Sequence, residues 1–177
     1  LKNDEHILGR ACLEIVINLY KGLSMSLYMA ERKKVCFVTP FFYPVIGGVE
    51  THILELSKEL QKKGWDTYVV TSDSDRFGRV KGREEIYQGI KIVRCKTLFK
   101  VTFGEIFFPE ALKEIRRINP NIIHFHGYRH WYNLLPFTLN KPCFVTPHWP
   151  DYRGQRGRGT QMLADLIDIT IGKTLFN

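Results

Sequence analysis

The chain has 177 residues, of which 44% are hydrophobic, and a formal net charge of +8. Chains of about 150 residues already bury most of their apolar surface on folding, so we expect one well-packed domain. The longest apolar run, residues 13–20, is interrupted by polar residues and is far shorter than the ~20 residues that cross a bilayer, so it is excluded as a transmembrane helix. The first residues do not combine a basic segment, an apolar stretch and a small-residue cleavage site, so we expect a cytoplasmic protein.

Residues 1–33 form a leader that differs from the rest of the chain. Between Ile7 and Leu23 the apolar residues recur close to the helical period, which predicts an amphipathic helix that ends near Gly22. The apolar face of such a helix has to pack on the domain or on a second copy of the chain. Self-association through the leader is therefore one of two expectations, and whether the leader is native or an extension at an earlier start stays open.

From Lys34 onward, strand-like and helix-like segments alternate. The strand-like runs are mostly continuous β-branched or aromatic stretches, as expected for strands covered on both faces: residues 34–39, 67–71, 90–95, 121–125 and 143–146. Helices are predicted over residues 49–63, 109–118, 131–139 and 161–176. The alternation predicts an α/β domain over residues 34–177, with a Rossmann-like, doubly wound parallel sheet and helices on both faces. The charged, glycine-rich residues 73–88 are expected to be a mobile connection.

The cysteines and the basic residues indicate which classes of ligand and partner the chain is expected to bind. Cys36, Cys95 and Cys143 lie in strand-like runs, and no CxxC spacing occurs, so we expect reduced thiols and no metal site. The basic residues concentrate in two glycine-containing segments, residues 76–83 and 153–158. These segments fit loops around a phosphate, or equally well ordinary solvated charge. They are not interleaved with a platform of stacking aromatic residues, which argues against nucleic acid as a partner.

Two adjacent glycines, Gly47 and Gly48, stand between the first strand and the first helix. Ligands of parallel α/β sheets bind outside the carboxyl ends of the strands, where these glycines would lie. Without Cβ atoms the backbone can approach a ligand, and a helix N-terminus suits an anion such as a diphosphate. A tight turn alone would explain the pair equally well. The third glycine of a dinucleotide fingerprint is missing, but Asp73 and Asp75 stand where a ribose-binding acid would, so NAD binding remains an alternative.

Two further loops bring polar residues to the same edge of the sheet. His124 and His126 end the fourth strand in the stretch IIHFHGYRHW, and His148 follows the fifth strand in FVTPHWPDYRG. Because strand residues alternate between faces, His124 and His126 share one face. A single histidine in such a place is more often structural than catalytic. Three loops that deliver polar groups to one edge nevertheless favour a functional site.

The segments KVCFVTPFFYPVIGGVETHILELSKELQKKGWDTYVVTS, NIIHFHGYRH and KPCFVTPHWPDY together resemble one known family. They are similar to the N-terminal, acceptor-side domain of group-one glycosyltransferases, which are retaining enzymes with the two-domain GT-B fold. The first segment has a proline, two further residues and GGVE before an amphipathic helix, and the HxH and TPH stretches follow in the family's order. The resemblance covers residues 34–177, and the leader has no counterpart in it.

The resemblance implies roles for individual residues. Gly47 and Gly48 would lie against the diphosphate of the donor, whereas His126 and His148 would face the donor sugar and act at the reaction centre. Polar residues of the following loops would bind the acceptor or sugar: Tyr128, Arg129, Asp151 and Arg153. No metal and no cofactor are implied, and the donor substrate would be a nucleotide diphosphate sugar.

The resemblance also implies which parts and partners the domain needs. The sequence stops before the last strands of this domain and before the C-terminal domain that would hold the donor nucleotide. We therefore expect one domain of an enzyme that transfers a sugar from a nucleotide diphosphate sugar to an acceptor hydroxyl with retention, and expect it to be inactive alone. Its expected partners are the C-terminal domain, the nucleotide sugar and a sugar or lipid-linked acceptor, with peripheral contact at the inner face of a membrane. A non-catalytic nucleotide-binding or NAD-binding module is the competing hypothesis.

Overall fold

The computed structural model describes the core of the predicted domain, over residues 32–75, 77–100, 106–128 and 130–148. Three features predicted from the sequence lie outside these ranges: the leader apart from its last two residues, the helix over residues 161–176, and the loop that holds Asp151 and Arg153. Arg129 is also outside them.

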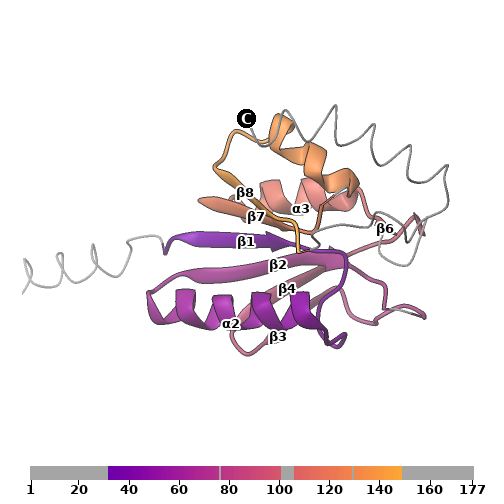
Figure 1. Cartoon of the computed structure of the whole chain (residues 1–177), viewed down its shortest axis with the longest axis horizontal. Helices are drawn as coiled ribbons and strands as arrows, with labels where there is room; N and C mark the ends of the chain where they lie inside the picture. The colour runs from indigo at the N-terminus through magenta and orange to yellow at the C-terminus, as the bar shows by residue number, and fades with distance from the viewer. Residues whose placement is uncertain (1–31, 76, 101–105, 129, 149–177) are drawn as a thin grey trace, which may run out of the picture. The chain divides into compact units, whose positions relative to one another are not determined.

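A six-stranded sheet forms the centre of this core (Figure 1). Five strands are parallel and lie in the order β4-β2-β1-β7-β8, with the bounds Ile90–Cys95, Asp66–Ser72, Lys34–Val38, Ile122–His126 and Cys143–Thr146. From β1 the chain adds β2 and β4 on one side and then β7 and β8 on the other, which is the order of a Rossmann-like sheet. The predicted fold is confirmed, and its topological switch point lies between β1 and β7.

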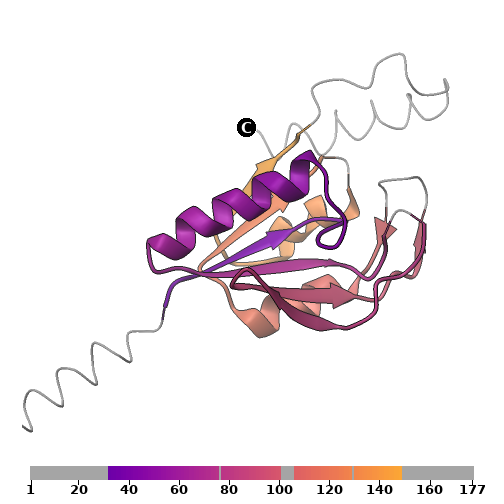
Figure 2. The same cartoon turned by 90° about the horizontal axis from the view of Figure 1, so that it is seen from below.

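Helices cover both faces of the sheet because its strands are apolar on both sides. Val35 and Phe37 of β1 pack in the core beneath the first helix, whereas Cys36 and Val38, which point the other way, belong to the core beneath the second. The helices are α2 (Gly48–Lys62), α3 (Glu110–Ile118) and the 3₁₀ helix η1 (Trp131–Thr138). Figures 1 and 2 show α2 on one face of the sheet and α3 with η1 on the other. The N-terminus of α2 therefore comes to the carboxyl edge, next to the switch point.

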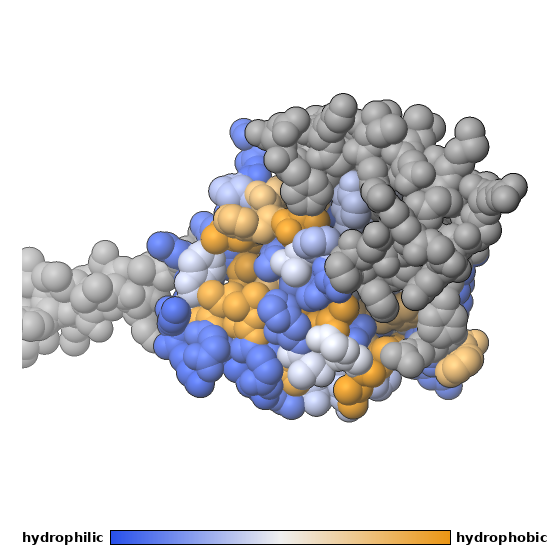
Figure 3. Space-filling view, viewed as in Figure 1, coloured by the Kyte–Doolittle hydropathy of each residue, from blue (hydrophilic) through white to orange (hydrophobic). Residues whose placement is uncertain are grey.

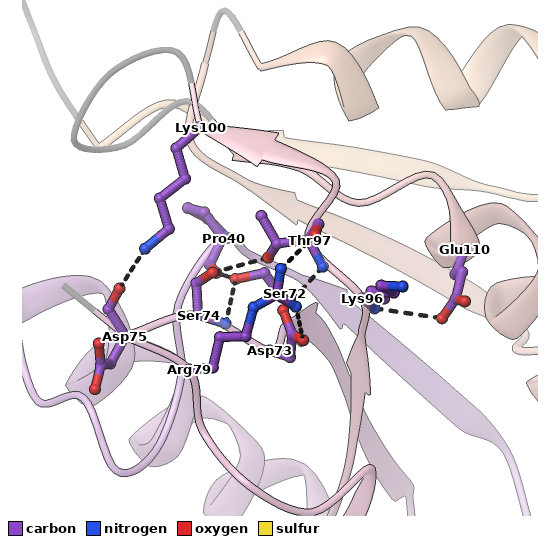
Figure 4. Close-up of polar contacts among 10 residues, drawn as sticks. All are labelled: Pro40, Ser72, Asp73, Ser74, Asp75, Arg79, Lys96, Thr97, Lys100 and Glu110. Atoms are coloured by element: carbon purple, nitrogen blue, oxygen red, sulfur yellow. Dashed lines mark hydrogen bonds and ion pairs between the residues drawn. The ribbon is translucent and has the colours of Figure 1, made fainter. Parts of the chain in front are cut away.

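The expectation of a mobile connection over residues 73–88 is wrong for the part that the structure describes. The segment ends in β3 (Glu84–Tyr87), which pairs antiparallel with β4 at the edge of the sheet. Near its beginning, Asp73 accepts the backbone N–H of Thr97 at 2.8 Å and forms an ion pair of 2.6 Å with Arg79 (Figure 4). The composition of the segment suggested a solvated loop because Thr97 lies 24 residues from Asp73 in the sequence.

Two smaller elements also differ from the expectations. The helix predicted over residues 131–139 is the 3₁₀ helix η1, in which Pro136 has no N–H to donate to an α-helical ladder. A separate pair of short antiparallel strands, β5 (Phe99–Lys100) and β6 (Ile106–Phe107), was not predicted from the sequence.

The buried side chain of Arg94 ties the loop after β1 to the edge hairpin. Only 1% of the side chain is exposed, and it donates to the Tyr43 carbonyl at 2.7 Å and to the Glu85 carboxylate at 2.6 Å. We expect Arg94→Met to lower the free energy of unfolding by about 2–3 kcal/mol, because both acceptors lose a charged donor. The partly exposed Glu85 can turn to water, which limits the loss. Urea denaturation measures the effect, and Arg116→Met, at an exposed position of α3, is the control; equal stability of the two variants would contradict the expectation.

Candidate functional site

Four histidines gather at the carboxyl edge of the sheet, and we call them the histidine cluster: His52, His124, His126 and His148. They come from α2, from β7 and from the segment after β8. The rings of His126 and His148 are stacked with centroids 5.0 Å apart, and the ring of His52 lies 5.7 Å and 5.4 Å from them. The centroid of His124 is 4.2 Å from that of His126. Three elements that are distant in the sequence thus meet at the switch point.

Hydrogen bonds and burial order the cluster from inside to outside. Nδ1 of His126 lies 2.8 Å from Nε2 of His148, so one ring donates to the other, and Nε2 of His124 lies 2.7 Å from the Thr146 hydroxyl. The His126 ring is fully buried, whereas His148 is half-buried and His52 is exposed. Nε2 of His126 has no hydrogen-bond partner among the described residues. Solvent or a ligand therefore reaches the cluster through His148 and His52.

The inner histidines are neutral at pH 7. Burial, reinforced by the neighbouring histidines, lowers the pKa of His126 to about 2 and that of His124 to about 4. Burial and the nearby His52 also lower the pKa of His148. Neutral imidazoles donate and accept hydrogen bonds without adding positive charge. The inner part of the cluster is therefore suited to hydroxyl groups, and charge on an anion has to be met elsewhere.

The backbone at the end of β7 is held in place from two sides. The N–H of Gly127 donates to the Thr146 carbonyl at 2.9 Å. From η1, the Tyr132 hydroxyl donates to the His126 carbonyl at 2.7 Å, and the Asn133 amide donates to the Gly127 carbonyl at 3.2 Å. These contacts fix the position from which the His126 ring projects.

Gly47 and Gly48 form the start of α2, as predicted. Gly47 is the N-cap residue and has no side chain that could cap the first N–H groups of the helix. A Cβ at Gly48 would meet nothing within 4 Å, and the backbone there does not adopt the left-handed conformation that favours glycine. Gly48 precedes His52 by four residues, so the two lie on one face of α2, beside the histidine cluster. Neither the backbone nor the packing of the domain requires glycine at position 48, which leaves open space for a ligand.

One hollow lies beside the glycine turn, and another lies at the opposite end of the sheet. An apolar pocket of about 70 Å³ adjoins the glycine turn and is lined mainly by Phe42, Tyr43, Val45, Ile46, Leu54 and Tyr87. Figure 3 shows apolar residues at the surface near the end of the molecule where α2 begins. The larger cavity, about 570 Å³, is lined by residues near the amino ends of the parallel strands, among them Lys34, Tyr68 and Lys91. It is therefore remote from the histidine cluster.

The structure brings together most of the described candidates. His126 and His148 are in direct contact, and His52 links them to the turn of Gly47 and Gly48. Tyr128 lies at the same end of β7, whereas Arg129, Asp151 and Arg153 are outside the described residues. His52 was not predicted from the sequence, although its spacing of four residues from Gly48 was a usable signal.

The alternative of NAD binding loses its main support in the structure. Asp73 and Asp75, which stood where a ribose-binding acid would, are both engaged within the domain: Asp73 by Thr97 and Arg79, and Asp75 by the backbone N–H groups of Phe77 and Gly78. Among the described residues there is no group of three or more His, Cys, Asp and Glu placed to hold a metal ion. None of the helices within the described ranges is long and apolar enough to span a bilayer.

Comparison with known proteins places the chain among enzymes that act on sugars. One subunit of the phosphatidylinositol N-acetylglucosaminyltransferase of Homo sapiens is 38% identical over 110 residues, which are 58% of this chain and 22% of that protein. The gpi3 subunit of the same enzyme in Schizosaccharomyces pombe is 35% identical over 94 residues, 51% of this chain and 20% of that protein. A GDP-mannose:cellobiosyl-diphosphopolyprenol alpha-mannosyltransferase of Xanthomonas oryzae pv. oryzae is 31% identical over 122 residues, 65% of this chain and 31% of that protein.

The chain thus spans less than a third of the length of each of these relatives. Its residues 46–172, which are most of the chain, match the family model of Glycosyltransferase Family 4. The match includes the glycine turn, all four members of the histidine cluster and the strands that carry them. The resemblance to group-one glycosyltransferases is confirmed, and the chain belongs to Glycosyltransferase Family 4.

Proposed function

We propose that this domain takes part in the transfer of a sugar from a nucleotide diphosphate sugar to an acceptor hydroxyl, with retention at the anomeric carbon. The observation that carries the proposal is the meeting of the glycine turn and the histidine cluster at the switch point, supported by membership of the family. The human relative is named for phosphatidylinositol and the Xanthomonas relative for a diphosphopolyprenol. By analogy we propose a lipid-linked acceptor, met in the cytoplasm at the inner face of a membrane.

The proposed reaction places negative charge close to the glycine turn. The bond between the anomeric carbon and a phosphate oxygen breaks, and the acceptor oxygen bonds to that carbon. The leaving diphosphate takes the bonding electron pair and can accept the proton of the acceptor hydroxyl. The N-terminal N–H groups and the dipole of the 15-residue helix α2 stabilise such an anion, and Gly48 lets it approach the backbone. A donor-binding domain would supply the remaining contacts to the nucleotide.

Of the four histidines in the cluster, one positions another and two can contact the sugar. His126 is fully buried, so it acts through its 2.8 Å hydrogen bond to His148 instead of touching the substrate itself. His148 and His52 are the members that a sugar hydroxyl can reach. Because the inner rings are neutral at pH 7, they can accept or donate a hydrogen bond without attracting a second anion. His52 therefore joins the site that the sequence predicted without it.

Substitution of Gly48 separates a ligand-binding role from a purely structural one. We expect Gly48→Val to leave the fold intact, because a Cβ there has open space. The dissociation constant for a phosphosugar such as mannose 1-phosphate should rise about tenfold or more, since the side chain keeps the phosphate away from the backbone. NMR titration of the 177-residue chain measures this. Glu59→Val, at an exposed position farther along α2, is the matched control, and equal affinities of both variants and the unmodified chain would contradict the proposal.

A further inference from the structure

Three large hydrophobic side chains are exposed on the two neighbouring segments that follow β2 and β4. Phe77 is 93% exposed, Leu98 57% and Phe99 54%, and we call these three residues the apolar ledge. Phe77 lies in the turn after β2, whereas Leu98 and Phe99 lie at the start of the β5–β6 pair. Soluble proteins tolerate single exposed apolar residues, but a group of large ones marks a surface that meets a partner.

The two segments of the apolar ledge are bonded into one structural unit (Figure 4). The Lys100 ammonium donates to the Asp75 carbonyl at 3.0 Å, and the Arg79 guanidinium donates to the Thr97 carbonyl at 3.0 Å. The hydroxyls of Ser74 and Thr97 are 2.8 Å apart in the buried layer beneath. The exposure of the ledge is therefore a property of an ordered surface, since both segments are held to each other.

The turn that carries Phe77 is itself held by a carboxylate. One oxygen of Asp75 accepts the backbone N–H of Phe77 at 2.7 Å and also that of Gly78. The same residue offers its carbonyl to Lys100 from the neighbouring segment. Phe77 thus extends into solvent from a closed turn at the edge of the molecule.

Exposed cations lie on the same two segments as the apolar ledge. Lys81, Lys96 and Lys100 are exposed, and Arg79 is 56% exposed while paired with Asp73. Arg79 offsets the charge of Asp73, whereas the Asp75 carboxylate accepts backbone N–H groups and keeps its charge, so three exposed lysines against one carboxylate leave these segments positive. Large apolar side chains among lysines match the interface of a bilayer that contains anionic lipids, where the rings enter the headgroup region and the ammonium groups meet phosphates.

The geometry of the ledge favours a bilayer over a protein groove. Leu98 and Phe99 are consecutive residues of an extended segment, so their side chains point to opposite sides of it. A partner protein usually covers one side of a strand, whereas the headgroup region surrounds an inserted segment on all sides. Phe99 stacks on Phe107 across the β5–β6 pair, with ring centroids 4.9 Å apart, which packs the two strands against each other.

We propose that the apolar ledge and its lysines dock this domain onto the surface of an anionic phospholipid bilayer. The proposal deepens the proposed function, on which it rests, because a lipid-linked acceptor lies in such a bilayer. The segments that carry the ledge follow the carboxyl ends of β2 and β4, at the same edge of the sheet as the start of α2 (Figures 1 and 2). Docking there would bring the glycine turn and the histidine cluster towards lipid headgroups.

Vesicle flotation of the 177-residue chain tests the proposal. We expect the chain to float with phosphatidylcholine vesicles that contain about 30% phosphatidylserine, and to bind pure phosphatidylcholine vesicles far less, since the lysines need anionic lipid. The double variant Phe77→Ser/Leu98→Ser should bind the anionic vesicles about tenfold or more weakly, because two apolar side chains no longer enter the interface. Salt near ~1 M should also weaken binding of the unmodified chain.

Ile86→Ser is the matched control, because Ile86 is 71% exposed but lies on β3, at the level of the amino end of β4. It should bind vesicles like the unmodified chain. The proposal is overturned if the unmodified chain does not float or if the double variant binds as well as the unmodified chain. It is also overturned if Ile86→Ser loses as much binding as the double variant. If the unmodified chain forms a dimer and the double variant does not, the ledge is an interface with a second copy of the chain, which would also overturn the proposal. Flotation uses no sugar and the phosphosugar titration uses no membrane, so the two proposals fail separately.

Discussion

Acidification from pH 7 to pH 5 is expected to lower the free energy of unfolding by about 3 kcal/mol. Histidines in the unfolded chain have a pKa near 6.5, whereas burial lowers that of His126 to about 2 and that of His124 to about 4. Below pH 6.5 the unfolded state therefore binds protons that the folded state does not. About 2 kcal/mol comes from His126 and the rest, reduced for its partial exposure, from His124.

Urea denaturation at pH 7, 6 and 5 measures this loss of stability, and the variant His126→Gln shows how much of it comes from His126. The variant lacks one of the buried imidazoles, so its stability should fall by about 2 kcal/mol less than that of the unmodified chain over the same range. Carboxyl groups with ordinary pKa values near 4 are ionised throughout this range and add little. Equal pH dependence of both proteins would show that His126 is not held neutral in the folded state.

Gly127→Ala is expected to lower the free energy of unfolding by about 3 kcal/mol. Gly127 has a φ of +95°, which side chains disfavour, and a Cβ there would lie 2.6 Å from Nε2 of His130 and 3.3 Å from the Tyr132 hydroxyl. The His130 ring is stacked on that of Tyr132, so it cannot move away without loss of packing. The substitution should also displace the neighbouring His126.

Gly82→Ala is the matched control for this prediction. Gly82 has a similar φ of +88°, but a Cβ there would meet nothing within 4 Å. Backbone strain alone should cost it about 1 kcal/mol. Thermal or urea denaturation of both variants separates strain from the steric clash, and equal losses would mean that the His130 ring yields readily.

The framework of the fold was predictable because apolar runs mark strands covered on both faces. The strands β4 and β8 match their predicted bounds, and the carboxyl-edge position of His126 and His148 followed from strand ends alone. The ordered structure of the segment from Asp73 onward was not predictable. Asp73 is held by Arg79 and by Thr97, 24 residues away, and no local pattern indicates such a partner.

The candidate site was predictable as a set of loops but not as an arrangement of rings. The alternation of strand residues placed His124 and His126 on one face, and the structure shows their centroids 4.2 Å apart. Sequence reasoning could not tell that His148 would cover His126, because this contact depends on how the segment after β8 returns over β7. The participation of His52 depends in the same way on where α2 crosses the sheet edge.

The proposed sugar site is tested most directly by an NMR titration of the 177-residue chain with mannose 1-phosphate, followed through backbone amides and histidine rings. We predict that the amide of Gly48 and the ring signals of His52 and His148 shift together along one binding curve. We also predict that the signals of the amino-end cavity around Lys34 and Lys91 stay in place. Unchanged signals at Gly48 and the histidines at millimolar ligand, or shifts confined to the basic segment around Arg79, would contradict a phosphate-bearing sugar site at this edge of the sheet.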